Sequence, residues 1–290
     1  MFLKMIKFNK RYLTLIFLLF FLILLRTDYR LIDKPVCCGD DHDYYSHSET
    51  LVVDFDLDYS NQLKGFETKR YNNLGKIAPK GFIGTGVLSA PFLFLGNIID
   101  NMLFSIANVN PNKFFNYKIL LYSLSSVFYF FVSIFLIQKT LFNLKIASNI
   151  NHLLLIFLGS GLPYFAFERY SMTHIYEVFT ISLIFYLSSK FYSYEEENKN
   201  LYAFLIPFIT ILSLLVRWTN YYVLFLPIIF KLLFIKKLNK SASLMRTFSA
   251  YISIVFSFLG FLFINYLIYG FVGLNPNKIY GNAGSKLDYF

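Results

Sequence analysis

Long apolar runs separated by short polar stretches recur along the whole chain. Runs of roughly 17–25 apolar residues are typical of helices that cross a lipid bilayer, and shorter ones can span if flanking cations reach the interface. The pattern predicts an all-α fold, a polytopic transmembrane helical bundle forming a single membrane domain over residues 1–290. The runs cover residues 12–25, 82–106, 118–138, 152–167, 175–192, 201–216, 219–235 and 247–268.

The composition agrees with a membrane protein. Hydrophobic residues make up 56% of the chain and charged residues 15%, against about 25% charged residues in soluble domains. The net charge of +10 comes from short Lys and Arg clusters between the apolar runs, not from a long basic stripe. We therefore expect membrane lipid and no nucleic acid among the partners.

The first apolar run, residues 12–25, follows a basic stretch that ends at Arg11. A cleaved signal peptide has this pattern, but no small-residue cleavage site follows the run, whose next residues are 26–29. We favour an uncleaved first transmembrane helix, which predicts a multi-pass protein of the cell (plasma) membrane with a cytoplasmic N-terminus.

Basic clusters in short loops mark the cytoplasmic side of a membrane protein, and they fall near Lys139, 190–199 and 231–246. With the N-terminus inside, residues 27–80 form a large outer loop, residues 118–268 hold the remaining transmembrane helices and residues 269–290 form an outer tail. The polar segments between the other helices, 166–174 and 217–219, then reach the same outer face.

The run 82–106 contains several glycines, Pro91 and the polar Asp100. These residues make an uninterrupted span doubtful, so we prefer a juxtamembrane or re-entrant element. A crossing is the alternative.

An acidic cluster, Asp40, Asp41 and Asp43, opens the outer loop. Carboxylates this close ionise together only if a cation compensates them, which suits a metal site or a base of raised pKa. A divalent cation held by Asp40 and Asp41 is therefore possible, and no cofactor is certain. A solvated loop is the alternative interpretation.

Two further polar groups lie at the predicted outer ends of helices. Glu168, Arg169 and His174 belong to one, and ionisable side chains at a membrane boundary are expected to face the bundle or an aqueous cavity. A lone histidine such as His174 is more often an interfacial hydrogen-bonding residue than a catalyst.

The other group is Arg217-Trp218-Thr219-Asn220. A guanidinium at this rim could make paired hydrogen bonds to a phosphate, whereas the alternative is an interfacial anchor in an aromatic belt. Both can hold.

The order of these motifs resembles membrane glycosyltransferases of the GT-C type, which depend on polyprenol-phosphate sugars and are related to protein mannosyltransferases and aminoarabinose transferases. The resemblance lies in Asp-Asp-x-x-Tyr-Tyr at 40–45, V-D-x-D-L-D-x-S-N at 53–61 and K-G-x-x-G-T-x-x-x-x-x-P-F at 80–92, followed by the turn at 215–220. Trp218 replaces the family's usual proline. Family members carry more helices than this chain, which suggests a C-terminally truncated or shortened member.

The resemblance implies a catalytic acidic residue in the first outer loop, with Asp40 and Asp41 as the matching pair and Asp43 as a third candidate. It also implies donor-phosphate binding by Arg217 or Arg169, and substrate contacts from the residues beside them. The candidate substrate-binding residues are Glu168, His174, Asn220 and Tyr44.

We therefore expect an enzyme that moves a sugar from a polyprenyl-phosphate donor to a glycan, lipid or protein acceptor on the extracytoplasmic face. The alternative is a non-enzymatic polytopic transporter or a component of a lipid-linked-sugar flippase. Transporters usually carry ionisable residues near the midplane and internal repeats, which are not evident in this sequence.

Overall fold

The computed structural model describes residues 39–65, 76–107, 116–192, 199–234 and 240–270. The predicted first helix at 12–25 and most of the predicted outer tail lie outside the described residues. Within the described ranges the chain is helical and contains no β-strand, which confirms the all-α prediction.

The helices follow the apolar runs closely. In chain order the elements are α2 (Gly39–Glu49), the π-helix η3 (Thr50–Asp54), α4 (Gly84–Ala107), α5 (Tyr117–Asn143), α6 (Ile150–Gly159), α7 (Leu162–Phe167), α8 (Thr173–Tyr192), α9 (Lys199–Val216), the 3₁₀ helix η5 (Trp218–Phe225), α10 (Leu226–Phe234) and α11 (Lys240–Tyr269).

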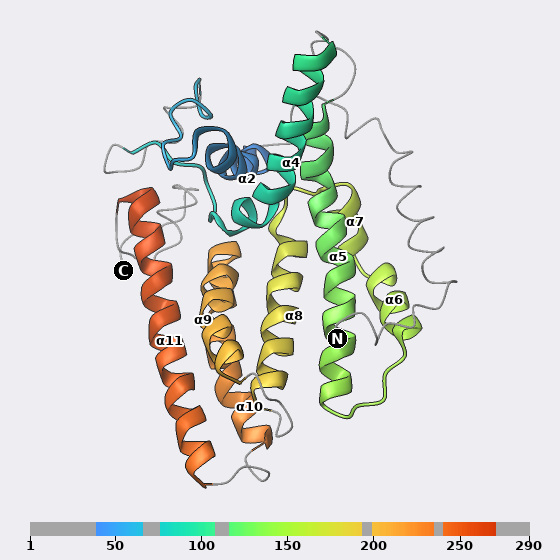
Figure 1. Ribbon diagram of the computed structural model, residues 1–290, viewed down its shortest axis with the longest axis vertical. Coiled ribbons are helices and arrows are strands. Elements are labelled where there is room, and N and C mark those ends of the chain that lie inside the picture. Colours follow the sequence, from blue (N-terminus) through green and yellow to red (C-terminus); the bar gives the residue numbers. More distant parts are fainter. Residues whose placement is uncertain (1–38, 66–75, 108–115, 193–198, 235–239, 271–290) are drawn as a thin grey trace, which may run out of the picture.

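Four helices, α5, α8, α9 and α11, lie side by side and form the body of the molecule (Figure 1). In the order of packing, α8 lies between α5 and α9, and α9 packs against α11. Three described helices are long and apolar enough to cross a membrane, at Gly84–Ser105, Tyr117–Asn143 and Tyr251–Tyr269. The structure therefore indicates an association with membranes.

Two of the predicted helices are broken. The run 152–167 becomes α6 and α7, because Ser160 and Gly161 interrupt it and Pro163 starts the second helix. The run 219–235 begins as the 3₁₀ helix η5 after an extended Arg217 and continues as α10.

The glycines of α4 serve close packing and do not interrupt the helix. A Cβ on Gly84 would lie 2.4 Å from the backbone carbon of Leu215, and a Cβ on Gly86 would lie 2.4 Å from Cβ of His47. The run forms one continuous helix, and its small residues let α4 touch the backbones of α9 and α2.

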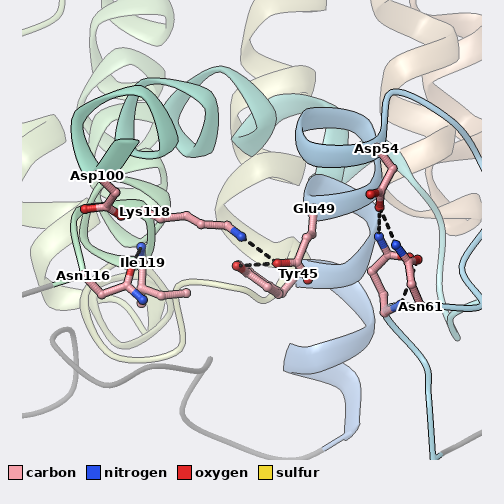
Figure 2. Close-up of polar contacts among 9 residues, drawn as sticks. Tyr45, Glu49, Asp54, Asn61, Asp100, Asn116, Lys118 and Ile119 are labelled. Carbon is pink, nitrogen blue, oxygen red and sulfur yellow. Dashed lines mark hydrogen bonds and ion pairs between the residues drawn. The ribbon is translucent and has the colours of Figure 1, made fainter. Parts of the chain in front are cut away.

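Asp100 has a structural role in the C-terminal half of α4. Its two carboxylate oxygens accept hydrogen bonds from the backbone N–H groups of Tyr117 (3.1 Å) and Lys118 (2.9 Å), the first residues of α5. Figure 2 shows Asp100 beside Lys118. A carboxylate at this end of a helix satisfies exposed N–H groups and complements the helix dipole. The polar residue that made a membrane span doubtful thus caps the next helix.

The helix α4 begins at one end of the body. Its first residue, Gly84, contacts the last turn of α9, and the Tyr129 hydroxyl of α5 donates to the Leu88 carbonyl (2.9 Å). From there α4 runs antiparallel to the first half of α5 and away from α9 (Figure 1). Its length and composition also allow a crossing, so both predictions for residues 82–106 stand.

Candidate functional site

The short helix α2 lies across the end of the body where α4 begins (Figure 1). Its sequence is polar, yet its side chains are almost all buried, including Asp41, Asp43, His47 and Ser48. The alternative of a solvated acidic loop is therefore wrong for Asp41 and Asp43, whereas Asp40 is exposed. Buried polar groups require partners, and the contacts of α2 supply them.

Two contacts fix the C-terminal turn of α2 to α4 and α5. The Ser48 and Ser89 hydroxyl oxygens lie 2.6 Å apart across the α2–α4 contact. Glu49 accepts hydrogen bonds from the Lys118 ammonium (2.7 Å) and from the Tyr45 hydroxyl (3.2 Å), as Figure 2 shows. These contacts hold α2 against both helices.

A buried histidine fixes the other side of α2. His47 Nε2 donates to the Gly81 carbonyl (3.2 Å), which leaves Nδ1 to accept from the Tyr59 hydroxyl (2.9 Å). Burial lowers the pKa of His47 to about 4, although the bond to Gly81 opposes this, so the ring is neutral at physiological pH. The Tyr269 hydroxyl, at the end of α11, donates to the same carbonyl.

This histidine was not among the candidate residues predicted from the sequence. The sequence feature that could have pointed to its surroundings is the glycine at position 81. In the structure, Gly81 has a positive φ of 89°, which favours glycine. A Cβ at this position would lie 2.7 Å from Cε1 of Tyr44. Tyr44, a predicted substrate-binding residue, is buried against this glycine.

An ion pair joins α2 to the turn between α7 and α8. Oδ2 of Asp41 lies 3.2 Å from Nη2 of Arg169. The carboxylate is inside, with 4% of its side chain exposed, whereas the guanidinium reaches the surface with 23% exposed. Burial raises the pKa of Asp41 to about 6, against the opposing effect of Arg169 and with a smaller contribution from Asp40.

A second ion pair lies close to the first. Nη1 of Arg217 is 3.1 Å from Oε2 of Glu177, with the arginine again more exposed than the acid, at 38% against 17%. His174 interacts electrostatically with both arginines, and its ring stacks on Phe165 at 3.8 Å between centroids with a 9° interplanar angle. We call the five polar side chains the rim cluster: Asp41, Arg169, His174, Glu177 and Arg217.

The sequence predicted that all five side chains reach one rim, but it did not predict that Glu177 is the partner of Arg217. Among the other candidates, Asp40 is exposed at the start of α2, Asp43 is fully buried, and Glu168 is half-buried beside Arg169.

Asn220, predicted to bind substrate, lies in the interior and outside the rim cluster. Its side chain is fully buried, and its amide nitrogen donates to the backbone carbonyl (3.0 Å) and the hydroxyl (3.3 Å) of Ser213. The amide fixes the turn from α9 to η5 and thereby orients Arg217 at the start of that turn.

The acidic residues after α2 stabilise their own loop. Asp56 accepts from the Thr50 hydroxyl (2.8 Å), and Asp54 accepts from the side chains of Asn61 (2.9 Å) and Gln62 (Figure 2). Across the described ranges, no group of three or more His, Cys, Asp and Glu side chains is arranged to hold a metal ion. The counter-charge beside Asp41 is the guanidinium of Arg169.

The rim cluster therefore combines a buried carboxylate of raised pKa with two guanidiniums whose tips reach the surface. Such a carboxylate can accept a proton near neutral pH, and guanidiniums can hold a phosphate. No family model, curated protein or solved structure matches the chain, so the arrangement of these side chains carries the functional assignment.

Proposed function

We propose that this protein is a multi-pass membrane glycosyltransferase that moves a sugar from a polyprenyl-phosphate donor to an acceptor on the extracytoplasmic face. The observation that carries the proposal is the ion pair of Asp41 and Arg169, which joins the first outer loop to the α7–α8 turn beside Arg217. These are the segments that the resemblance to GT-C enzymes assigns to the base and to the donor phosphate.

The membrane topology follows from the helices and the basic clusters. The end of the body that carries the rim cluster is opposite to the end that carries Lys139 and Lys190. In α8, His174 and Glu177 lie near the first turn and Lys190 lies in the last turn. In α5, Lys118 at the first turn bonds Glu49 of α2, and Lys139 lies near the last turn. Clustered Lys and Arg residues favour the cytoplasmic side. The rim cluster then faces outward, where lipid-linked sugars are used.

In the proposed reaction Asp41 acts as the general base. Its carboxylate takes the proton of the acceptor hydroxyl as the acceptor oxygen bonds to the anomeric carbon of the sugar. The bond from that carbon to the phosphate oxygen breaks, and its electron pair stays on the phosphate. A base with a pKa near 6 is mostly ionised at neutral pH and still accepts a proton readily.

Arg169 and Arg217 are proposed to hold the departing phosphate. Each guanidinium can donate paired hydrogen bonds to phosphate oxygens, and these bonds strengthen as negative charge develops there. His174, which stacks on Phe165 and interacts electrostatically with both arginines, is proposed to donate a further hydrogen bond.

The test is sugar transfer from radiolabelled polyprenyl-phosphate sugars in membranes that contain the full chain. Asp41→Asn should lower transfer at least about 100-fold, since a general base contributes roughly that much or more. Glu49→Gln is the matched control, because it removes a carboxylate from another ion pair of the same helix. Equal transfer by folded Asp41→Asn and Glu49→Gln proteins would exclude Asp41 as the base.

A transporter predicts a different result. Movement of a lipid-linked sugar across the membrane without transfer to any acceptor, unchanged by Asp41→Asn, would favour the flippase alternative over the enzyme.

A further inference from the structure

The two ion pairs of the rim cluster share one asymmetry. In each, the guanidinium is more exposed than the carboxylate, with 23% against 4% for Arg169 and Asp41 and 38% against 17% for Arg217 and Glu177. An anion arriving from outside therefore meets the arginines before it meets the acids.

The charges of the cluster do not yet favour an anion. Two guanidiniums and two carboxylates leave these four side chains without net charge when all are ionised. A phosphate that joined them with every pair intact would lie close to two carboxylates, and like charges within a few ångströms repel. For a phosphate to bind tightly, one carboxylate must dissociate from its arginine.

Of Asp41 and Glu177, Asp41 is the carboxylate that a phosphate displaces more easily from its arginine. It makes a single ion pair through Oδ2, and among the described residues its other oxygen, Oδ1, has no hydrogen-bond partner, although it is buried. The charged group next to it in the chain, Asp40, also repels its ionised form, and Tyr122 faces it from α5. The ionised carboxylate is thus poorly compensated apart from Arg169.

We infer that a ligand with a phosphate group binds the rim cluster by replacing the Asp41 carboxylate on Arg169, so that ligand binding itself releases Asp41. The inference rests on the proposed assignment of Arg169 and Arg217 to a phosphate. In the proposed enzyme, the base is held in an ion pair until the donor arrives, which prevents it from acting on water alone.

The chain offers an internal probe for this exchange. Trp218 is its only tryptophan and follows Arg217 directly. Its fluorescence in the full protein, purified into lipid nanodiscs, should respond to phosphate binding at the cluster. Two probes separate the possible sources of the phosphate: farnesyl phosphate, which has a short polyprenyl tail, and inorganic phosphate.

The exchange makes an unusual prediction for Asp41→Asn. Removal of the competing carboxylate should tighten the binding of both probes by about tenfold, because the ligand no longer has to break the hydrogen bond between Asp41 and Arg169. Glu49→Gln, which removes a carboxylate from the Lys118 pair, should change the affinity by less than about twofold. Arg169→Gln should weaken binding, and Asp41→Asn should have no further effect in that background.

Several outcomes would overturn the inference. Binding that is unchanged or weakened in Asp41→Asn, an equal gain in Glu49→Gln, or a gain seen with farnesyl phosphate alone would each contradict exchange at the phosphate. If Asp41→Asn does not fold, an infrared difference spectrum of the unaltered protein replaces it. Phosphate binding should then change a carboxylate band, and a spectrum without that change would contradict the inference.

These binding measurements do not require sugar transfer. Tighter binding in Asp41→Asn together with no transfer by the unaltered protein would support the exchange and refute the proposed enzyme. Normal transfer with no gain in binding would do the reverse.

Discussion

The helices α2 and α11 depart from the usual distribution of polar and apolar residues in opposite directions. α2 is polar and buried, with Asp41, Ser46 and His47 all in the interior, whereas α11 is apolar and exposes large side chains such as Leu259 and Phe263. In a water-soluble protein the first would be costly without partners, and the second would be an aggregation hazard. Together they fit a protein whose surroundings are lipid and whose polar groups gather at one end.

The largest expected effect comes from closing the space that admits α2. Gly86→Leu would place side-chain atoms where Cβ of His47 now lies, because even a Cβ at this position would approach it to 2.4 Å. We expect the free energy of unfolding to fall by about 3 kcal/mol or more, seen as a lower melting temperature of the detergent-solubilised protein. A well-folded Gly86→Leu protein with normal melting would show that α2 does not pack on α4 as described.

The next effect tests the exposed face of α11. Leu259 is 58% exposed and lies near the middle of the apolar segment Tyr251–Tyr269. If this face contacts lipid, Leu259→Asp should cost about 3 kcal/mol in membrane insertion, whereas Leu259→Ala should cost far less. The measurement is the inserted fraction in a glycosylation-mapping assay, and equal insertion of the two variants would argue against contact with lipid.

A smaller effect concerns the pH dependence of stability, through His47. Because its pKa of about 4 in the folded protein lies below the ordinary 6.5, its contribution is complete above pH 6.5 and is lost as the pH falls. The expected loss is about 2 kcal/mol by pH 5, seen as a falling melting temperature. His47→Asn should flatten that dependence, and an equally steep decline in the variant would assign it to other groups.

Asp41 acts in the opposite sense and sharpens this test. Its folded pKa of about 6 lies above the ordinary 3.8, so protonation between these values favours the folded state as the pH falls. Asp41→Asn should therefore steepen the loss of stability in acid. A shallower loss in the variant would contradict the assigned shift.

The smallest effect is expected at the edge of α2. Glu49 and Lys118 form an ion pair of 2.7 Å, but both side chains are partly exposed, at 27% and 20%. Such pairs contribute about 1 kcal/mol or less. Lys118→Met should lower the melting temperature by only a few degrees, and a loss as large as that of Gly86→Leu would mean that the pair is a principal support of α2.

The helices of the body could be predicted from the sequence because a long, nearly continuous apolar run defines each of them. The runs 118–138, 175–192, 201–216 and 247–268 correspond to α5, α8, α9 and α11. The glycines of α4 left the prediction for residues 82–106 open, since glycine either breaks a helix or lets two helices touch, and only the neighbours decide between the two.

The helix α2 could not be predicted in the same way. Its residues show no apolar periodicity, and its burial depends on partners far along the chain, including Gly81, Ser89 and Arg169. The sequence did indicate that the acidic cluster and the arginines share one face, because charge placement determines topology. It did not indicate which acid pairs with which arginine, since that depends on the angle at which α2 crosses the end of the body.

The shared carbonyl of Gly81 also bears on the order in which the chain is made. α2 and Gly81 leave the ribosome early, but Tyr269, which donates to that carbonyl, follows 188 residues later. During synthesis the contacts around α2 therefore stay incomplete until Tyr269 has been made. A segment rich in aspartate, serine and histidine can stay exposed to water without aggregating, whereas an apolar segment would associate with other exposed apolar surfaces. The polarity of α2 suits an element that is completed only when the last described helix is in position.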